Sequence, residues 1–203
     1  MAEKTLENIH DIATKEFLEK GFRGASLREI VKKAGVTTGA FYGYYKSKEE
    51  LFDALVKEHA DYVRNIFDVT VIEFKKIPLE QWSEVMNAYS DRGMTQMFEY
   101  AWEHKNAFKL ILQASEGTVW ENYIHDIVEV EIELTHTFYK VIESQGYKPH
   151  RLDGALEHII ISGKFTSMFE MIVHDIPKEK GLSFVKELHA FYEAGWNSLL
   201  NRK

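Results

Sequence analysis

Apolar residues recur every three or four positions along most of the chain, which is the spacing of amphipathic α-helices. In the first stretch this spacing is kept by Leu6, Ile9, Ala13 and Phe17. Gly21 follows as a typical helix stop. Ser26 and Glu29 then form a capping box, in which two side chains accept N–H bonds at the start of a helix, and Gly35 ends that helix. The pattern predicts two helices within the first 35 residues.

The rest of the chain is also predicted to be helical. Thr37 can cap a short helix, and Ser47 with Glu50 forms a second capping box before a long helix that ends near Pro78. Beyond it we expect helical stretches at 79–114, 117–145, 150–175 and 179–201. The first of these contains a candidate junction between two helices at residues 104–106.

One segment, residues 128–134, alternates strictly between apolar and acidic residues, which is a strand pattern. A longer series with helical spacing includes it and flanks it on both sides: Trp120, Ile124, Ile127, Leu134, Phe138 and Val141. Because the longer pattern outweighs the shorter one, we interpret the segment as helical. The predicted fold class is all-α.

Composition limits the class of protein. The 203 residues are 45% hydrophobic and 28% charged, which is ordinary for a globular chain with a real core. The absence of cysteine excludes disulfides, thiol catalysis and thiolate metal sites, and it suits the cytoplasm, where we expect the protein. No run of about 18 apolar residues is present, and the N-terminus mixes both charge signs, so neither a membrane span nor a signal peptide is expected.

The net charge of −7 conceals a basic segment. Residues 1–50 hold nine Lys and Arg against eight Asp and Glu, whereas the remainder is strongly acidic. Within residues 22–48 a single acid, Glu29, faces six basic residues: Arg23, Arg28, Lys32, Lys33, Lys46 and Lys48. Such a local excess is typical of a surface that meets nucleic acid, although a solvated charged face is the alternative.

Two helices joined by a few residues with glycine at the joint form a helix-turn-helix, and here Gly35 stands at the joint. The second helix of this motif lies in the DNA major groove and presents its N-terminal residues to base edges. Gly39 would let the backbone approach DNA closely, and tyrosine hydroxyls would bind phosphates. Lys48, at the start of the next helix, could share a phosphate with backbone N–H groups.

Residues 5–55 closely resemble the N-terminal domain of the TetR family of bacterial transcriptional regulators. The resemblance rests on four phased elements, GF-x-x-A-S, REI-x-x-x-AGV, G-x-FY and K-S-K-E-x-L, which occur together without gaps. It implies an all-helical dimer with a three-helix DNA-binding domain at residues 1–48. It also implies a helical domain at residues 49–203 that binds a small-molecule effector and dimerises.

The resemblance implies operator-binding roles for Ser26, Arg28, Thr37, Thr38, Gly39, Tyr42 and Lys48, and the predicted DNA-binding set also includes Tyr44 and Lys46. Three positions depart from the family pattern, which often has a small residue at Val31, a basic one at Thr38 and a His-His pair at 43–44. The last two leave the base preference open. Alternatives also stay open: Thr37 as a cap only, Tyr44 as packing, Arg28 as a solvated charge.

The second domain is rich in Met, Trp and Phe, which suits either a plain core or an adaptable apolar cavity. The predicted ligand-binding residues are Met94, Phe98, Trp102, Trp120, Tyr123, Glu131, Phe165, Met168 and Phe169. Glu131 stands out because its helical phase places an acid on the apolar stripe between Ile127 and Leu134, where it would bind a cationic or hydroxylated ligand. Its alternative place is the solvated rim.

The last two helices carry apolar stripes with small residues, which permit close helix approach in a four-helix dimer bundle. The predicted dimer interface consists of Leu156, Ile159, Gly163, Leu188, Tyr192, Gly195, Trp196 and Leu199. An intramolecular core is the alternative.

An enzyme is not expected, because the chain lacks Gly-x-Ser-x-Gly, a Gly-rich phosphate loop and His-Glu-x-x-His. The rival class is a metal-binding helical bundle, since Glu133 and His136 have the Glu-x-x-His spacing of di-iron proteins and Glu7 with His10 repeats it. We expect no metal and no cofactor. The favoured interpretation is a homodimeric repressor that binds a near-palindromic double-stranded DNA operator and is released by a small apolar effector.

Overall fold

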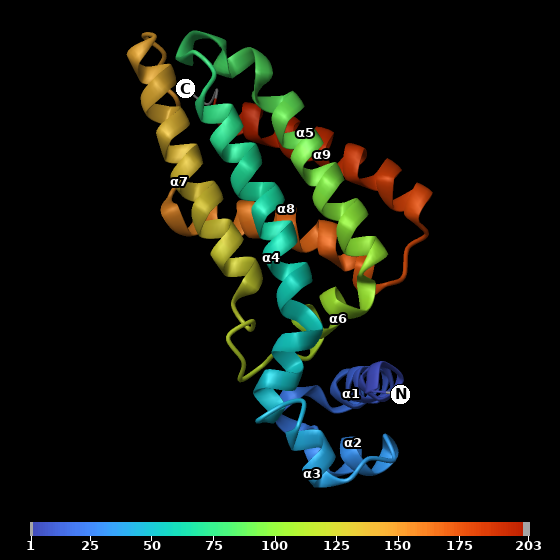
Figure 1. Cartoon of the computed structure of the whole chain (residues 1–203). Coiled ribbons are helices and arrows are strands. Elements are labelled where there is room, and N and C mark those ends of the chain that lie inside the picture. The colour runs from blue at the N-terminus through green and yellow to red at the C-terminus, as the bar shows by residue number, and fades with distance from the viewer. Residues whose placement is uncertain (1, 201–203) are drawn as a thin grey trace. The chain divides into compact units, whose positions relative to one another are not determined.

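The computed structural model describes residues 2–200, in which every regular element is a helix and no strand is present (Figure 1). Its elements are α1 Ala2–Gly24, α2 Leu27–Lys33, α3 Thr38–Tyr42, α4 Lys48–Lys75, the 3-10 turn η1 Leu79–Gln81, α5 Trp82–Glu103, α6 Lys105–Gln113, α7 Tyr123–Ser144, α8 Gly154–Val173 and α9 Lys178–Leu200. The all-α prediction is confirmed, and residues 128–134 lie inside the helix α7.

The chain forms two compact units. The first comprises the chain up to Tyr62 together with His104–Asn122, and the second comprises Val63–Glu103 together with the chain from Tyr123 onward. The helix α4 therefore begins in one unit and ends in the other. Residues 49–62 pack with the first unit, so the expected functional division between residues 48 and 49 does not coincide with this packing boundary and stays a prediction.

The predicted helix starts are set by local caps. The side-chain oxygens of Ser26, Thr37 and Ser47 accept N–H bonds from three residues further on, at 3.4, 3.1 and 3.1 Å, before α2, α3 and α4 respectively. Gly21 and Gly35 have φ angles of 69° and 67°, which only glycine adopts readily. Gly21 thus interrupts α1, and Gly35 makes the tight turn that follows α2.

Two of the predicted helix boundaries lie between α5 and α7. The candidate junction is confirmed, because α5 ends at Glu103 and α6 begins at Lys105. The predicted start of the next helix at residue 117 is wrong, since α7 begins at Tyr123. Gly117 has a φ of 88°, and the hydroxyl of Thr118 accepts the N–H of Trp120 at 3.1 Å. These residues turn rather than continue as a helix.

The core of the first unit is built around three phenylalanines from α1 and α4. The rings of Phe17 and Phe52 meet edge to face at 5.1 Å between centroids, and Phe22 meets Phe52 in the same way at 5.4 Å. All three are buried. Burying one such side chain contributes about 1.5–3 kcal/mol, so this cluster holds α1 against α4.

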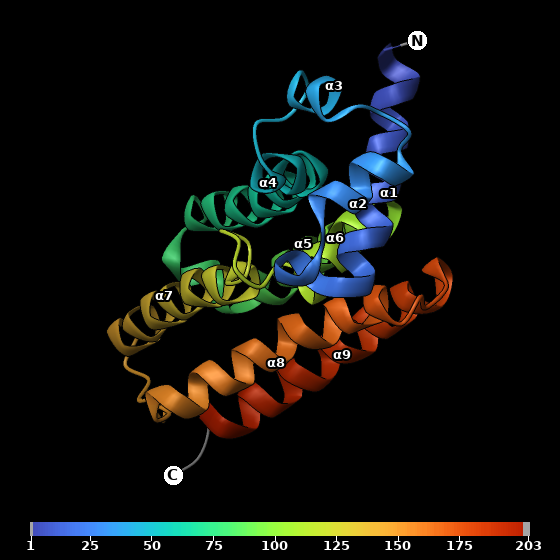
Figure 2. The ribbon, with the colours of Figure 1, turned by 90° about the horizontal axis from the view of Figure 1, so that it is seen from below.

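The second unit is a layered bundle in which α8 and α9 lie side by side and α9 also packs on α5 (Figure 2). At one end, Phe74 of α4 and Trp82 of α5 pack with Phe138 and Val141 of α7 in a buried cluster. None of the described helices is long and apolar enough to cross a membrane.

Candidate DNA-binding surface and effector cavity

The short helix α3 is held by one buried residue and presents the others to solvent. Phe41 is fully buried, whereas Thr38, Gly39 and Tyr42 are exposed, and Tyr42 keeps 53% of its surface. A five-residue helix is marginal alone, so its position depends on Phe41 packing in the core of the first unit. These three exposed residues belong to the set predicted to contact DNA, and that role stays a prediction.

Fewer basic side chains of residues 22–48 are available to contact DNA than the sequence suggested. The buried carboxylate of Glu16 accepts hydrogen bonds from Lys20 and Lys33 at 2.6 and 2.7 Å, which lower its pKa to about 2. Arg23 pairs with Glu116 at 2.6 Å. Two of the six basic residues between 22 and 48 therefore have acidic partners inside the unit. Arg28 and Lys46 are exposed and remain candidates for phosphate contacts.

Lys48 stands at the start of α4, as expected, and its ammonium is bound by backbone carbonyls. Its Nζ donates hydrogen bonds to the carbonyl oxygens of Phe22 and Ala25, at 2.7 and 3.1 Å, and lies 4.5 Å from the centroid of the Phe22 ring. The ammonium thus joins the start of α4 to the connection between α1 and α2. A phosphate contact by Lys48 stays a prediction, and such a contact would have to share or replace these bonds.

Tyr44 and its neighbour Tyr45 differ in burial. Tyr44 is 36% exposed, whereas Tyr45 is buried and its hydroxyl lies 2.5 Å from Nε2 of His10 on α1. Burial raises the pKa of Tyr45 and lowers that of His10. The helix α3 ends at Tyr42, so both tyrosines lie in the turn that leads to α4.

The second unit contains a cavity of about 160 Å³ bounded by residues of α4, α5, α7, α8 and α9. Most of the surface of its wall is apolar, and flexible methionine side chains form part of it. The lining includes Phe67, Val71, Phe74, Met86, Met94, Met97, Leu134, Phe138, Ile161, Phe165 and Trp196. Three of the predicted ligand-binding residues, Met94, Glu131 and Phe165, lie in this wall.

The other six predicted ligand-binding residues are not in the lining of this cavity, and their ligand-binding role stays a prediction. Phe98 is fully buried against Gly181, and the indole of Trp102 donates to the carbonyl of Ile176 at 2.9 Å. The indole of Trp120 donates to Asp53 at 3.0 Å, within the first unit. Tyr123, Met168 and Phe169 are buried core residues, of which Tyr123 and Phe169 have rings 6.4 Å apart.

A pair of opposite charges stands in the apolar wall. Nζ of Lys164 lies 2.9 Å from Oε1 of Glu131 and donates to Oγ of Ser90 at 3.2 Å. The side chains of Lys164 and Glu131 are only 14% and 19% exposed. Glu131 therefore faces the cavity rather than the solvated rim. Lys164 and Ser90 were not predicted, because they lie 33 and 41 residues from Glu131 in sequence and only the fold brings the three together.

An apolar face on α8 and α9 is exposed in the single chain. Leu156, Ile159 and Phe191 keep 44%, 64% and 71% of their surfaces. Among the other predicted dimer residues, Leu188, Tyr192, Trp196 and Leu199 are half-buried, and Gly195 is exposed. Gly163 accommodates the Tyr192 hydroxyl, which would lie 2.9 Å from a Cβ at that position. Dimerisation through this face stays a prediction, and Phe191 is a residue that the sequence analysis missed.

The rival metal site does not assemble from the Glu-x-x-His spacings. Nε2 of His136 lies 2.6 Å from the buried carboxylate of Glu157, while Glu133, three residues earlier on α7, is exposed. The second copy ends in His10, which bonds to Tyr45. These histidines face different partners, so the spacing produces no shared ligand set here.

Residues 9–55 match the family model for bacterial regulatory proteins of the tetR family. The regulator YdgC of Bacillus subtilis is 41% identical over 61 residues, which is 30% of this chain and 31% of that protein. The regulator AcrR of Shigella flexneri is 43% identical over 54 residues, 27% of this chain and 25% of that protein. The repressor KstR2 of Mycobacterium tuberculosis is 31% identical over 71 residues, 33% and 36% of the two chains. The matches thus span about a quarter to a third of these relatives.

Likeness to solved structures extends over nearly the whole chain. A transcriptional regulator from Aquifex aeolicus covers 94% of this chain and 98% of its own, with a TM-score of 0.50 and 24% identity. FadR from Bacillus subtilis, solved in complex with stearoyl-CoA, covers 92% and 96%, with a TM-score of 0.55 and 17% identity. At these identities the likeness shows a shared fold.

Proposed function

Because the chain belongs to the TetR family of bacterial regulatory proteins, we propose that it is a transcriptional repressor that binds operator DNA in the cytoplasm as a homodimer. The observation that carries this proposal is the exposure of Thr38, Gly39 and Tyr42 on a helix anchored by Phe41. A helix that follows a tight turn and exposes polar residues can enter the major groove, while α2 braces it from behind.

The dimer requires a second copy, and the exposed face of Leu156, Ile159 and Phe191 supports its use as the interface. Two identical reading helices would meet DNA about 35 Å apart, or at a related spacing, so the operator would be near-palindromic. Selection from random duplexes should return two inverted half-sites. Enrichment of single-copy sites, or of none, would overturn this proposal.

A matched pair of variants sharpens that selection experiment. Ile159→Glu places a charge in the exposed face of α8 and should give a monomer that loses tight operator binding. Val119→Glu makes the same change at another exposed apolar residue, which is 82% exposed in the first unit, and should leave binding intact. Equal binding by both variants would exclude this face as the interface.

The cavity in the second unit supports an effector with a mostly apolar body and a polar group. Most of the wall surface is apolar, but polar side chains also line it, among them the Glu131–Lys164 pair, and FadR of similar fold was solved in complex with stearoyl-CoA. An effector that binds best to the DNA-free form must weaken operator binding by linkage, usually by about 5–150-fold. Operator titrations with and without long-chain acyl compounds test this directly.

Tryptophan fluorescence can report the same event. Trp196 lines the cavity, whereas the indole of Trp102 is bonded to a backbone carbonyl outside it. A filled cavity should change the emission of Trp196. The response should therefore persist in Trp102→Phe and disappear in Trp196→Phe, and the opposite result would show that the ligand lies elsewhere.

A further inference from the structure

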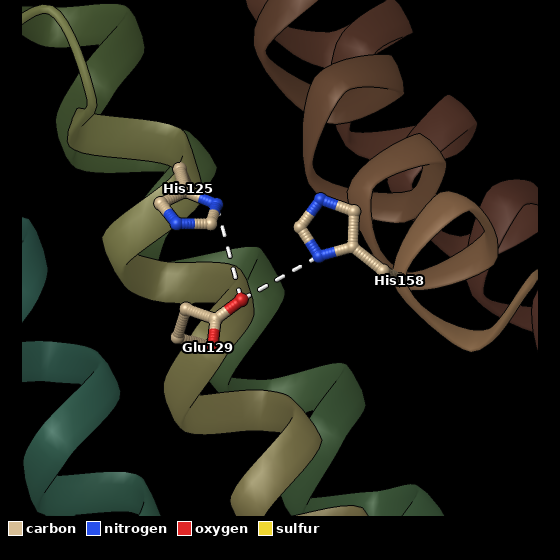
Figure 3. Close-up of side chains that lie close together, drawn as sticks. All are labelled: His125, Glu129 and His158. Carbon is tan, nitrogen blue, oxygen red and sulfur yellow. Dashed lines mark ion pairs between the residues drawn. The ribbon is translucent and has the colours of Figure 1, made fainter. Parts of the chain in front are cut away.

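Three side chains from two helices of the second unit converge outside the cavity. His125 and Glu129 lie one turn apart on α7, and His158 approaches them from α8 (Figure 3). Oε1 of Glu129 is 3.9 Å from Nδ1 of His125 and 3.5 Å from Nδ1 of His158. One candidate ligand atom from each residue lies within 4.8 Å of the other two.

We propose that His125, Glu129 and His158 bind a divalent transition-metal ion of the zinc class. Imidazole nitrogen and carboxylate oxygen are ligands that Zn²⁺ accepts, at distances of about 2.0–2.2 Å. Two ligand atoms at such a distance from one tetrahedral ion lie about 3.4 Å apart. The 3.5 Å separation already meets this value, and the 3.9 Å separation needs only a small side-chain rotation.

The arrangement suits an ion that enters from solvent. Residues four apart on a helix share one face, so α7 presents an imidazole and a carboxylate in the same direction. The three side chains are 38–56% exposed, which leaves them free to rotate and leaves a fourth coordination position to water. Three protein ligands with one open position are a common zinc arrangement.

The ion would link α7 to α8, two helices that also carry Glu131 and Lys164 of the cavity wall. Since the unfolded chain does not hold these residues together, the metal would bind the folded state preferentially and raise its thermal stability. The three residues belong to the second unit, whereas the predicted DNA contacts belong to the first. Its occupancy can therefore be measured whether or not the chain represses transcription.

A second His and Glu pair, at the end of α8, offers a matched control. His174 and Glu170 form an exposed pair four residues apart on and just beyond α8, with 3.0 Å between Nε2 and Oε2, but they do not belong to the three-residue group. This pair has the same two residue types in the same four-residue spacing and does not belong to a three-residue group. It tests whether an isolated His and Glu pair is sufficient to bind the ion.

The experiment is a calorimetric titration of the full chain with Zn²⁺, after chelator treatment and dialysis, with Co²⁺ absorption as a second probe. We expect one ion per chain. Loss of an outer-shell partner alone costs about 10–100-fold in metal affinity, so His158→Ala and His125→Ala should each cost at least that much. His174→Ala should bind like the wild type.

Circular dichroism of each variant confirms that its helices are retained. A wild-type chain that takes up no stoichiometric Zn²⁺ would overturn the proposal. So would a folded His158→Ala chain that binds Zn²⁺ as tightly as the wild type, because the ion would then be held by other residues.

Discussion

Replacing Lys48 by Met should weaken both the stability of the first unit and its affinity for DNA. The ammonium donates to the carbonyls of Phe22 and Ala25 at 2.7 and 3.1 Å, and a hydrogen bond to a charged group contributes about 1.5–3 kcal/mol. The second bond is long and the carbonyls can regain water. We therefore expect a loss near the value of one such bond, about 1.5–3 kcal/mol, rather than of two.

Lys46→Met is the matched control. Lys46 is exposed, and only its backbone N–H, which the substitution keeps, bonds to Glu50. The unfolding free energy of this variant should stay within about 0.5 kcal/mol of the wild type. If both lysines contact phosphates, each substitution should reduce the slope of log affinity against log salt by about 0.9.

Urea unfolding followed by circular dichroism measures the first effect, and fluorescence anisotropy of labelled operator at several salt concentrations measures the second. DNA binding is compared at a temperature where both variants are fully folded. A Lys48→Met chain as stable as the wild type would refute the structural role of the ammonium. An unchanged salt slope in the folded variant would refute the phosphate contact.

Three further changes have distinct readouts. The pKa of Glu16 is about 2 rather than 4.5, so its contribution to folding stability is full above about pH 4.5 and is lost as pH falls toward 2. Glu16→Gln should remove this pH dependence of the unfolding free energy in urea titrations. At pH 7 the substitution should cost about 1–3 kcal/mol, because solvent screens the lysine partners of Glu16. Gly181→Ala should lower the melting temperature, because its Cβ would lie 2.2 Å from the buried Phe98 ring. Glu131→Gln should alter effector preference in a thermal-shift screen, while operator affinity without effector stays unchanged.

The starts of several helices could be predicted from the sequence because the capping signals that set them are local. A cap depends on residues three apart, so the starts of α2, α3 and α4 follow from Ser26, Thr37 and Ser47. The start of α7 was not readable in this way. The segment before it is held by the bond from the Trp120 indole to Asp53, a residue 67 positions earlier.

The sites show the same limit. The exposed residues of α3 could be predicted because the helix-turn-helix has a fixed spacing. The partners of Lys48 could not, since they are backbone carbonyls that no residue type reveals. In the second unit, His158 lies 29 residues beyond Glu129, and Lys164 lies 33 beyond Glu131. Helical spacing places His125 beside Glu129, but only the packing of α8 against α7 supplies the third residue.

The charged pair in the cavity wall makes the chain attractive as a starting point for biosensors. Replacing Glu131 by Leu would leave the ammonium of Lys164 without its carboxylate, and the wall would then favour compounds that carry an acid. Replacing Lys164 by Leu would leave the carboxylate of Glu131, and the same wall would favour amines. A single codon change could thus direct one scaffold toward acids or toward bases, while the residues of α3 are left untouched.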